Sequence, residues 1–200
     1  MRDRYHGCQI IRLTLTTLYD KNRITTMAVY AYGKRIPKID PSSWIFPTAT
    51  IIGKVIIGAN CYIGAGTVIR GDYGKIKIGN GVSIEENVTI HARAGGKTII
   101  EDNATIGHAA MIHNCIIRHD AVIGMQATIS DYAEVGEFAI IGEAALVKSK
   151  QKIAPHKIAV GSPAKEIKEV PPAVSEFWQG VNEVYRDLAH SYPKKLRKLD

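Results

Sequence analysis

Large aliphatic residues recur along most of the chain at intervals of six positions. The series is Ile45, Ile51, Ile57, Ile63, Ile69, then Ile78, Ile84, Ile90, then Ile100, Ile106, Ile112, and finally Ile117, Ile123, Ile129, Val135, Ile141, Val147. A small residue often stands four positions after the aliphatic one, and glycine often follows it directly, as in Gly58 and Gly107. A period of six fits neither the 3.6-residue helix nor the two-residue alternation of a hairpin sheet. The pattern pauses over 70–77 and 91–99 and resumes after each pause.

This period predicts a parallel β-helix in which each hexapeptide forms a short strand and a corner. Three hexapeptides make one triangular coil, with the aliphatic side chains pointing into the prism. The repeat resembles the left-handed β-helix family, and the left hand is implied by that resemblance, since ordinary crossovers favour the right hand. We therefore expect an all-β left-handed parallel β-helix over 27–147. The alternative, a sandwich of unrelated short strands, does not explain so many positions in register.

Outside the repeat the chain changes character. The remaining segments are predicted as an N-terminal extension at 1–26, a connecting loop at 148–171, a C-terminal α-helix at 172–192 and a basic tail at 193–200. Apolar residues from Val174 to Leu188 lie on one face at helical spacing, and Pro193 is expected to end the helix. Met27 is a plausible alternative start, because the regular pattern begins soon after it.

The formal charge of +7 on 200 residues first suggests an anionic partner. The excess is concentrated at the ends, since residues 1–26 hold five basic and two acidic side chains and residues 194–200 hold four and one. The prism itself is nearly balanced, which argues against nucleic acid as a partner. No apolar run is long enough to span a membrane, and no clear signal peptide is present, so a cytoplasmic protein is expected. The three cysteines form no close pair and predict no disulfide framework.

Three polar residues are expected to form a ladder on one face of the prism. Arg70, His91 and His113 each follow an aliphatic residue, and these positions lie three hexapeptides apart. Stacked strands are spaced by about 4.8 Å. Two imidazoles at this spacing can bind one metal ion, because Zn–N bonds are about 2.0–2.1 Å long.

A second polar patch is expected on the preceding face, where Glu85 and Glu86 lie one coil below His108. The two patches are too far apart in one rigid prism to share a metal, but two prisms packed side by side bring them together. Three-fold closure satisfies every patch. The hypothesis is a homotrimer with a metal at each interface, bound by His91 and His113 of one chain and His108 of the next. Ordinary surface histidines are the alternative.

The motifs around these residues resemble the γ-class carbonic anhydrase family. The similar segments are Arg70-Gly71-Asp72, Ser83-Ile84-Glu85-Glu86-Asn87, Ile106-Gly107-His108, His113-Asn114-Cys115 and Ile123-Gly124-Met125. The resemblance implies a trimer with zinc on His91, His108 and His113 and an Arg70–Asp72 ion pair at the interface. Fe2+ or Co2+ fits the same ligands. Tyr73-Gly74, the 161–165 segment and the C-terminal helix resemble the phenylacetate-pathway and carnitine-operon subgroup, which is linked to CoA thioesters.

The chain departs from the family at two places. The Gln-Asp pair that usually precedes the first histidine reads Glu85-Glu86, and the acidic proton-shuttle loop is replaced by a short basic segment at 92–97. Glu85 can still accept a hydrogen bond or a proton from a bound water, although its charge can also raise the pKa of that water. Glu86 keeps the acidity of the usual Asp.

The sequence leaves several functions open. The first is a carbonic anhydrase-like lyase that hydrates CO2 to bicarbonate, with Glu85, Glu86, Arg70 and Asp72 as catalytic candidates. The second is a metal-dependent acyl-CoA thioesterase, and the third is an acyltransferase that uses a histidine as a general base. The fourth is a non-catalytic trimeric scaffold in which the metal is only structural.

Overall fold

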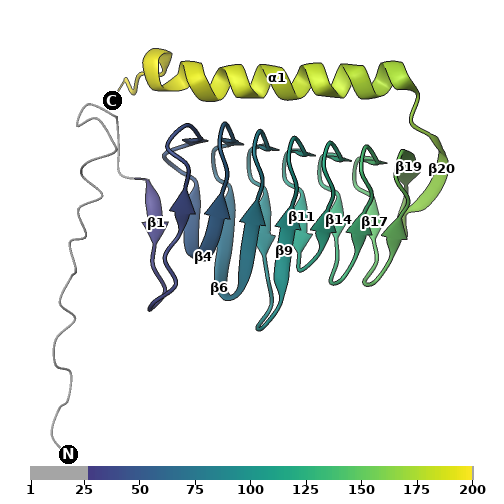
Figure 1. The fold of residues 1–200 in the computed structure, drawn as a ribbon, viewed down its shortest axis with the longest axis horizontal. Helices are drawn as coiled ribbons and strands as arrows, with labels where there is room; N and C mark the ends of the chain where they lie inside the picture. Colours follow the sequence, from purple (N-terminus) through teal and green to yellow (C-terminus); the bar gives the residue numbers. More distant parts are fainter. Residues whose placement is uncertain (1–26, 200) are drawn as a thin grey trace, which may run out of the picture.

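The computed structural model describes residues 27–199 and confirms the predicted class of fold (Figure 1). It shows a left-handed parallel β-helix of triangular coils with one long C-terminal helix beside it. The predicted extension at 1–26 lies outside the described residues. Each coil contributes one short strand to each of three faces, so strands that follow one another in the chain lie on different faces.

The strands of each face stack in order along the prism. The first face holds β1 (Ala28–Tyr30), β8 (Thr89–His91), β11 (Met111–His113), β14 (Thr128–Ile129) and β17 (Leu146–Val147). The second face holds β2 (Lys38–Ile39), β9 (Lys97–Ile100), β12 (Ile116–Ile117), β15 (Glu134–Val135) and β18 (Lys152–Ile153). The third face holds β3 (Trp44–Ile45), β5 (Tyr62–Ile63), β7 (Ser83–Ile84), β10 (Thr105–Ile106), β13 (Val122–Ile123), β16 (Ile140–Ile141), β19 (Lys157–Val160) and β20 (Lys165–Glu169).

Two longer strands join the first and second faces. β4 (Thr50–Ile57) and β6 (Val68–Ile78) continue around the corner between these faces, which together form one twelve-stranded sheet. At this corner Gly53 and Gly71 are paired neighbours. A Cβ on Gly53 would lie 2.5 Å from the carbonyl oxygen of Gly71, and Gly53 has a φ of +79°. Only glycine therefore lets the two backbones approach so closely.

The repeating aliphatic residues form the core. Ile69, Ile90 and Ile112 are paired in register on successive strands of the first face, and each side chain is fully buried. Complete burial of an aliphatic side chain contributes about 1.5–3 kcal/mol relative to leaving it exposed. Because a one-residue slip would turn every isoleucine outward, the same residues that stabilise the prism also fix the register of the polar residues beside them.

The regular pattern extends further than the sequence analysis predicted. The segment 148–171, expected to be a connecting loop, contains β18, β19 and β20. Ile153 and Ala159 continue the period of six and are buried. The outward lysines of β18 and β19 and the nearby Pro155 hid this continuation. β20 then pairs with β19 in the antiparallel direction and ends the stack.

The helix α1 (Pro172–Lys195) runs back along the third face, from the last coils toward the first (Figure 1). It begins where predicted but continues past Pro193, which was expected to end it at 192. Pro193 lacks an N–H donor, but the N–H of Leu196 still bonds to the carbonyl of Tyr192 at 2.9 Å, so the last turn persists. Asn182 and Ala189 are buried against the prism. Within 27–199 no helix is both long and apolar enough to cross a membrane.

Candidate functional site

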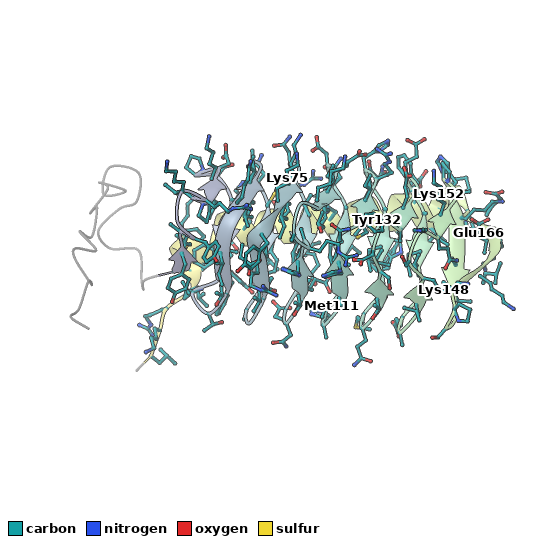
Figure 2. The ribbon with its side chains drawn as sticks, turned by 90° about the horizontal axis from the view of Figure 1, so that it is seen from below. Lys75, Met111, Tyr132, Lys148, Lys152 and Glu166 are labelled. Atoms are coloured by element: carbon teal, nitrogen blue, oxygen red, sulfur yellow. The ribbon has the colours of Figure 1, made fainter. Side chains whose placement is uncertain are left out.

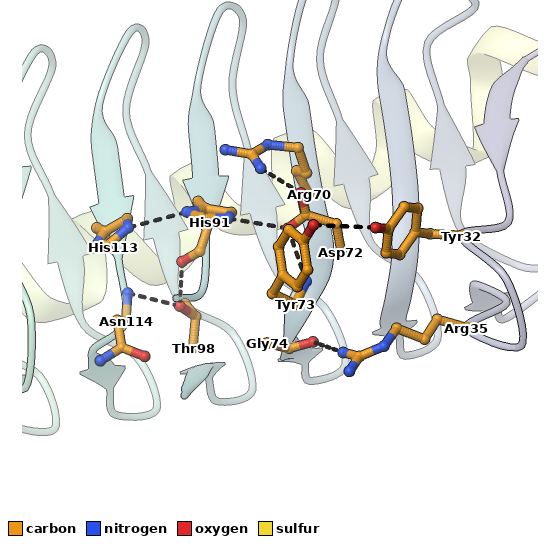
Figure 3. Close-up of polar contacts among 10 residues, drawn as sticks. All are labelled: Tyr32, Arg35, Arg70, Asp72, Tyr73, Gly74, His91, Thr98, His113 and Asn114. Atoms are coloured by element: carbon orange, nitrogen blue, oxygen red, sulfur yellow. Dashed lines mark hydrogen bonds and ion pairs between the residues drawn. The ribbon is translucent and has the colours of Figure 1, made fainter. Parts of the chain in front are cut away.

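The predicted ladder of Arg70, His91 and His113 forms on the first face (Figure 3). Arg70 is paired with His91 across β6 and β8, and His91 with His113 across β8 and β11. The Nδ1 atom of His91 lies 3.0 Å from the Nε2 atom of His113. The two rings are tilted by 41°, with their centroids 5.1 Å apart. Both side chains are partly buried, so the pair is held by its surroundings but remains open to a ligand.

Each imidazole contacts a carboxylate through its other nitrogen. The Nε2 atom of His91 lies 3.2 Å from Asp72, and the Nδ1 atom of His113 lies 2.5 Å from Asp131. An arginine in turn holds each carboxylate, since Arg70 bonds to Asp72 at 2.5 Å and Arg93 bonds to Asp131 at 2.9 Å. The result is a continuous polar chain across the first face.

Burial acts against ionisation of Asp72, but hydrogen bonds from Arg70, from the Tyr73 backbone and from His91 outweigh it and lower the pKa of this carboxyl. Asp72 is therefore a carboxylate at neutral pH and accepts a hydrogen bond from His91. A hydrogen bond to one ring nitrogen fixes which tautomer the imidazole adopts.

The backbone around the ladder is also fixed. The Thr98 hydroxyl donates to the carbonyl oxygen of His91 at 2.6 Å and accepts the N–H of Asn114 at 2.9 Å (Figure 3). Thr98 is fully buried. The Thr98 side chain thus links the backbone of Asn114, which follows His113, to the backbone of His91. This link fixes the positions of the two histidines on neighbouring coils.

The second predicted patch, Glu85, Glu86 and His108, also forms, at the corner between the third and first faces. The Nε2 atom of His108 lies 3.0 Å from Glu85 and its Nδ1 atom lies 2.8 Å from Glu86. Glu85 also accepts the backbone N–H of His108 at 3.0 Å. The Glu85 side chain is only 7% exposed, whereas that of His108 is 44% exposed. The imidazole is thus held between two carboxylates at the surface.

Two tyrosines fix these carboxylates from the side of the helix. The Tyr62 hydroxyl donates to Glu86 at 2.8 Å. Burial, followed by the bond with Glu86, raises the pKa of Tyr62 above its usual value. Tyr185 of α1 is shifted in the same direction by burial and by its hydrogen bond with Glu85. Because Tyr185 belongs to α1, the helix helps to position this patch.

The donors of the first ladder fit a tetrahedral metal. Two ligands of such a site are separated by roughly 3.3 Å when the metal–nitrogen bonds are about 2.0–2.1 Å. The observed separation between His91 and His113 is 3.0 Å. When each ring donates its N–H to its own carboxylate, the two facing nitrogens carry lone pairs, and a cation between them removes the repulsion. Imidazoles whose second nitrogen bonds to a carboxylate are typical metal ligands.

A single chain does not complete such a site. In the part of the chain that the structure describes, no group of three or more His, Cys, Asp or Glu side chains is arranged to hold a metal. The pair His91/His113 and His108 lie in separate clusters, as expected from their different positions on the prism. Cys61 and Cys115 take no part, because burial raises the pKa of the Cys61 thiol to about 11 and that of Cys115 to about 12.

Asp131 and Arg93 belong to the site but were not predicted from the sequence. The position of Asp131 could have been predicted from the repeat. Ile129 is paired with Ile112, so Ser130-Asp131 lies one coil beyond His113-Asn114. Arg93 lies on the exposed loop between β8 and β9, where the repeat is interrupted. Its contact with Asp131 depends on the path of that loop, and the period of six does not predict it.

Comparison with known proteins agrees with this architecture. Residues 37–71 match the family model described as bacterial transferase hexapeptide (six repeats). The chain is 36% identical to the carnitine operon protein CaiE of a Proteus species, over 81% of this chain and 82% of the relative. It is 37% identical to CaiE of Citrobacter koseri, over 82% of this chain and 83% of that relative.

Solved structures show the same fold. A Bacillus cereus protein provisionally assigned as an acetyltransferase is 37% identical, with a TM-score of 0.81 over 82% of this chain and 96% of that one. A hexapeptide transferase family protein from Anaplasma phagocytophilum is 31% identical, with a TM-score of 0.79 over 82% of this chain and 98% of that one. The N-acyltransferase AntD of B. cereus, crystallised with dTDP and coenzyme A, shares the fold at 17% identity and a TM-score of 0.62, over 80% of this chain and 100% of that one. From its extended similarity to CaiE and its hexapeptide coils, the chain belongs to the hexapeptide-repeat family of the carnitine operon protein CaiE.

Proposed function

We propose that the protein is a trimeric metalloenzyme whose divalent metal is bound by His91 and His113 of one chain and His108 of the next. The observation that carries the proposal is the 3.0 Å approach of two imidazole nitrogens whose opposite nitrogens are each held by a carboxylate. Zinc is the metal that three imidazoles suit best, and Fe2+ and Co2+ are alternatives.

Exposed apolar side chains support a trimer built around the first face. Met111 and Met125 are 40% and 42% exposed beside the corner that carries His108, and Tyr132 is 55% exposed at the opposite edge of the same face. Figure 2 shows Met111 and Tyr132 on the side of the prism away from α1. If the first faces surround a three-fold axis, the His108 edge of one chain meets the His113 edge of the next, and every edge is covered.

The proposed reaction is the attack of water on a small carbonyl carbon, with CO2 hydration as the specific case. His91, His113 and the neighbouring chain's His108 would hold the divalent metal, which would supply Lewis-acid activation of water near neutral pH. Asp72 and Asp131 contact the outer nitrogens of His91 and His113, so that the facing nitrogens can offer their lone pairs to a metal. Metal binding by His108 would require one ring nitrogen to leave its carboxylate, and the released Glu85 or Glu86 would then be free to accept a proton from the attacking water.

Acyl transfer or hydrolysis at a CoA thioester is the second candidate, and the contacts of His108 favour it. An imidazole held between Glu85 and Glu86 can act as a general base without a metal once one ring nitrogen leaves its carboxylate. The provisional assignment of the B. cereus structure as an acetyltransferase also supports acyl transfer as a candidate function.

The two candidate functions are distinguished by measuring CO2 hydration and CoA release for three metal-loaded proteins. These are the wild type, His91→Ala and His108→Ala. The metal-dependent reaction requires that both variants lose the activity. Loss in His108→Ala with retention in His91→Ala would favour the general-base reaction instead. If loaded wild-type protein supports neither reaction above buffer, both candidates fail and the trimer is a binding protein with a structural metal.

Glu85→Gln tests the carboxylate that differs from the γ-class pattern. The matched control is Glu101→Gln, because Glu101 accepts the backbone N–H of His119 at 3.2 Å much as Glu85 accepts that of His108. We expect Glu85→Gln alone to change the rate of CO2 hydration. An equal change in both variants would show that the effect is only structural.

A further inference from the structure

A pocket of about 510 Å³ opens on the second face, on the first coils of the prism. Its volume lies within the roughly 300–1,000 Å³ range of small-molecule sites. Five of the lining residues carry positive charge, and the lining contains no acidic residue: Lys34, Arg35, Lys38, Lys54 and Lys75. The pocket therefore concentrates positive charge within a segment, residues 27–193, whose basic and acidic side chains nearly balance overall.

The lysines continue as a ladder across neighbouring strands. Lys54 and Lys75 directly precede Val55 and Ile76, which are paired between β4 and β6, and Lys75 is itself paired with Lys97 of β9. Like charges directly opposite each other destabilise a sheet. No ion pair found within residues 27–199 involves these three lysines. The pocket lining contains no carboxylate that could relieve the repulsion, and a bound anion would relieve it.

The rim of the pocket adds exposed apolar side chains. Tyr73, Ile36 and Ile56 line it and are 56%, 52% and 43% exposed. Tyr73 forms an edge-to-face pair with Tyr32, with ring centroids 5.7 Å apart. An aromatic rim beside a cationic floor matches a ligand with several negative charges at one end and a flat ring at the other, because base–aromatic stacking contributes about 1–3 kcal/mol.

The loop that borders the pocket is already held in place. Arg35 donates to the carbonyl oxygen of Gly74 at 3.1 Å, and the hydroxyls of Tyr32 and Tyr73 are 3.2 Å apart (Figure 3). Tyr32 and Arg35 also form a short bridge with each other. These contacts tie the 32–35 turn to the corner of β6, so the pocket exists before any ligand arrives, which reduces the entropic cost of binding.

We propose that this pocket binds a nucleoside polyphosphate, with the phosphates on Lys54 and Lys75 and the base against Tyr73. The site lies on the second face, whereas the candidate metal ligands lie on the first face and on the corner between the third and first faces. Figure 2 places Lys75 apart from Met111 of the first face. The inference therefore goes beyond the proposed reaction and stands independently of the metal.

The test is titration calorimetry of the full chain with ADP, AMP, adenosine and inorganic pyrophosphate, in a buffer that contains a metal chelator. We expect ADP to bind more tightly than AMP and more tightly than pyrophosphate, with affinity that falls as salt rises. A double Lys54→Gln/Lys75→Gln variant should bind ADP at least about tenfold more weakly, since each charge-assisted contact to phosphate is lost.

The matched control is Lys148→Gln/Lys168→Gln, which removes the same charge from exposed lysines away from the pocket. Removing like charges from the ladder should leave the melting temperature of the pocket variant at or above that of wild type, so weak binding cannot be attributed to unfolding. The proposal is overturned if both double variants lose affinity equally or if adenosine competes as well as ADP. It is also overturned if a single-stranded oligonucleotide binds while ADP does not.

Discussion

At the scale of single residues, the candidate centre depends on the partners of its histidines. His91 and His113 each have one nitrogen on a carboxylate and one nitrogen facing the other ring. Asp72 and Asp131 therefore determine whether the two facing nitrogens offer lone pairs in the same direction. Arg70 and Arg93 hold these two carboxylates in place through ion pairs.

Asp131→Asn should weaken metal binding by about 10–100-fold, the usual cost of losing such an outer partner. An amide no longer requires the Nδ1 atom of His113 to carry the proton, so the lone pair toward His91 is less often available. The measurement is Zn2+ affinity by competition with a chromogenic chelator. Asp120→Asn is the control, because Asp120 makes a similar contact with His119 at 2.9 Å away from the ladder. Equal loss in both variants would refute the role of Asp131.

His119 provides a pH-dependent contribution to stability that is separate from the candidate centre. The hydrogen bond with Asp120, aided by Glu137 and opposed by burial, raises the pKa of His119 above its usual value. The contribution is therefore complete below the unfolded pKa of about 6.5 and is lost as pH rises through the higher folded pKa.

His119→Gln should lower the free energy of unfolding near about pH 6 by no more than about 1 kcal/mol, because the ring is half-exposed, and should have little effect near about pH 9. Urea denaturation at the two pH values measures this. His156→Gln is the control, since His156 stacks on Phe138 and has no ion pair among the described residues. A loss that is the same at both pH values would contradict the assignment.

At the scale of elements, the corner between the first and second faces places Arg70 and Asp72 beside His91. β6 continues through this corner because Gly71 and Gly53 let two backbones meet closely. Arg70 and Asp72 flank Gly71, so the close approach of the backbones and the ion pair share one structural cause.

Gly53→Ala should destabilise the fold by about 1–3 kcal/mol more than Gly33→Ala, the cost typical of overpacking. Both glycines have positive φ, but a Cβ on Gly33 meets nothing within 4 Å, whereas one on Gly53 meets the Gly71 backbone. Thermal and urea unfolding of the two variants give the comparison. Equal destabilisation would mean that only the φ angle matters at this corner.

The strands and their register were predictable from the sequence, because a period of six with three strands per coil fixes which residues stack. This arithmetic placed His113 on His91 and Glu85 beneath His108. It failed where the chain leaves the period: the loop that carries Arg93, the 32–35 turn beside the basic pocket, and the first strands β1 and β2. Lys152 and Lys157 obscured the coils after Val147, since charged outward residues conceal an inward Ile153.

At the scale of the whole molecule, the three faces have different roles. The third face is covered by α1, the second carries the basic pocket, and the first carries the histidine ladder between two exposed apolar edges. In a single prism the first face is uncovered. His91 and His113 lie in one cluster there, and His108 lies in another. The proposed metal site therefore requires the assembly, because its ligands come from neighbouring chains.

Native mass spectrometry of the full-length protein, after Zn2+ loading and removal of free metal, measures whether neighbouring chains share the zinc. We expect a trimer with one zinc ion per chain for wild type and almost no zinc for His91→Ala or His108→Ala. Mixing the two variants under conditions of subunit exchange should restore part of the zinc, because some interfaces then combine an intact His91/His113 pair with an intact His108. A zinc-loaded monomer, or a trimer whose zinc content is unchanged in His108→Ala, would show that neighbouring chains do not share the zinc.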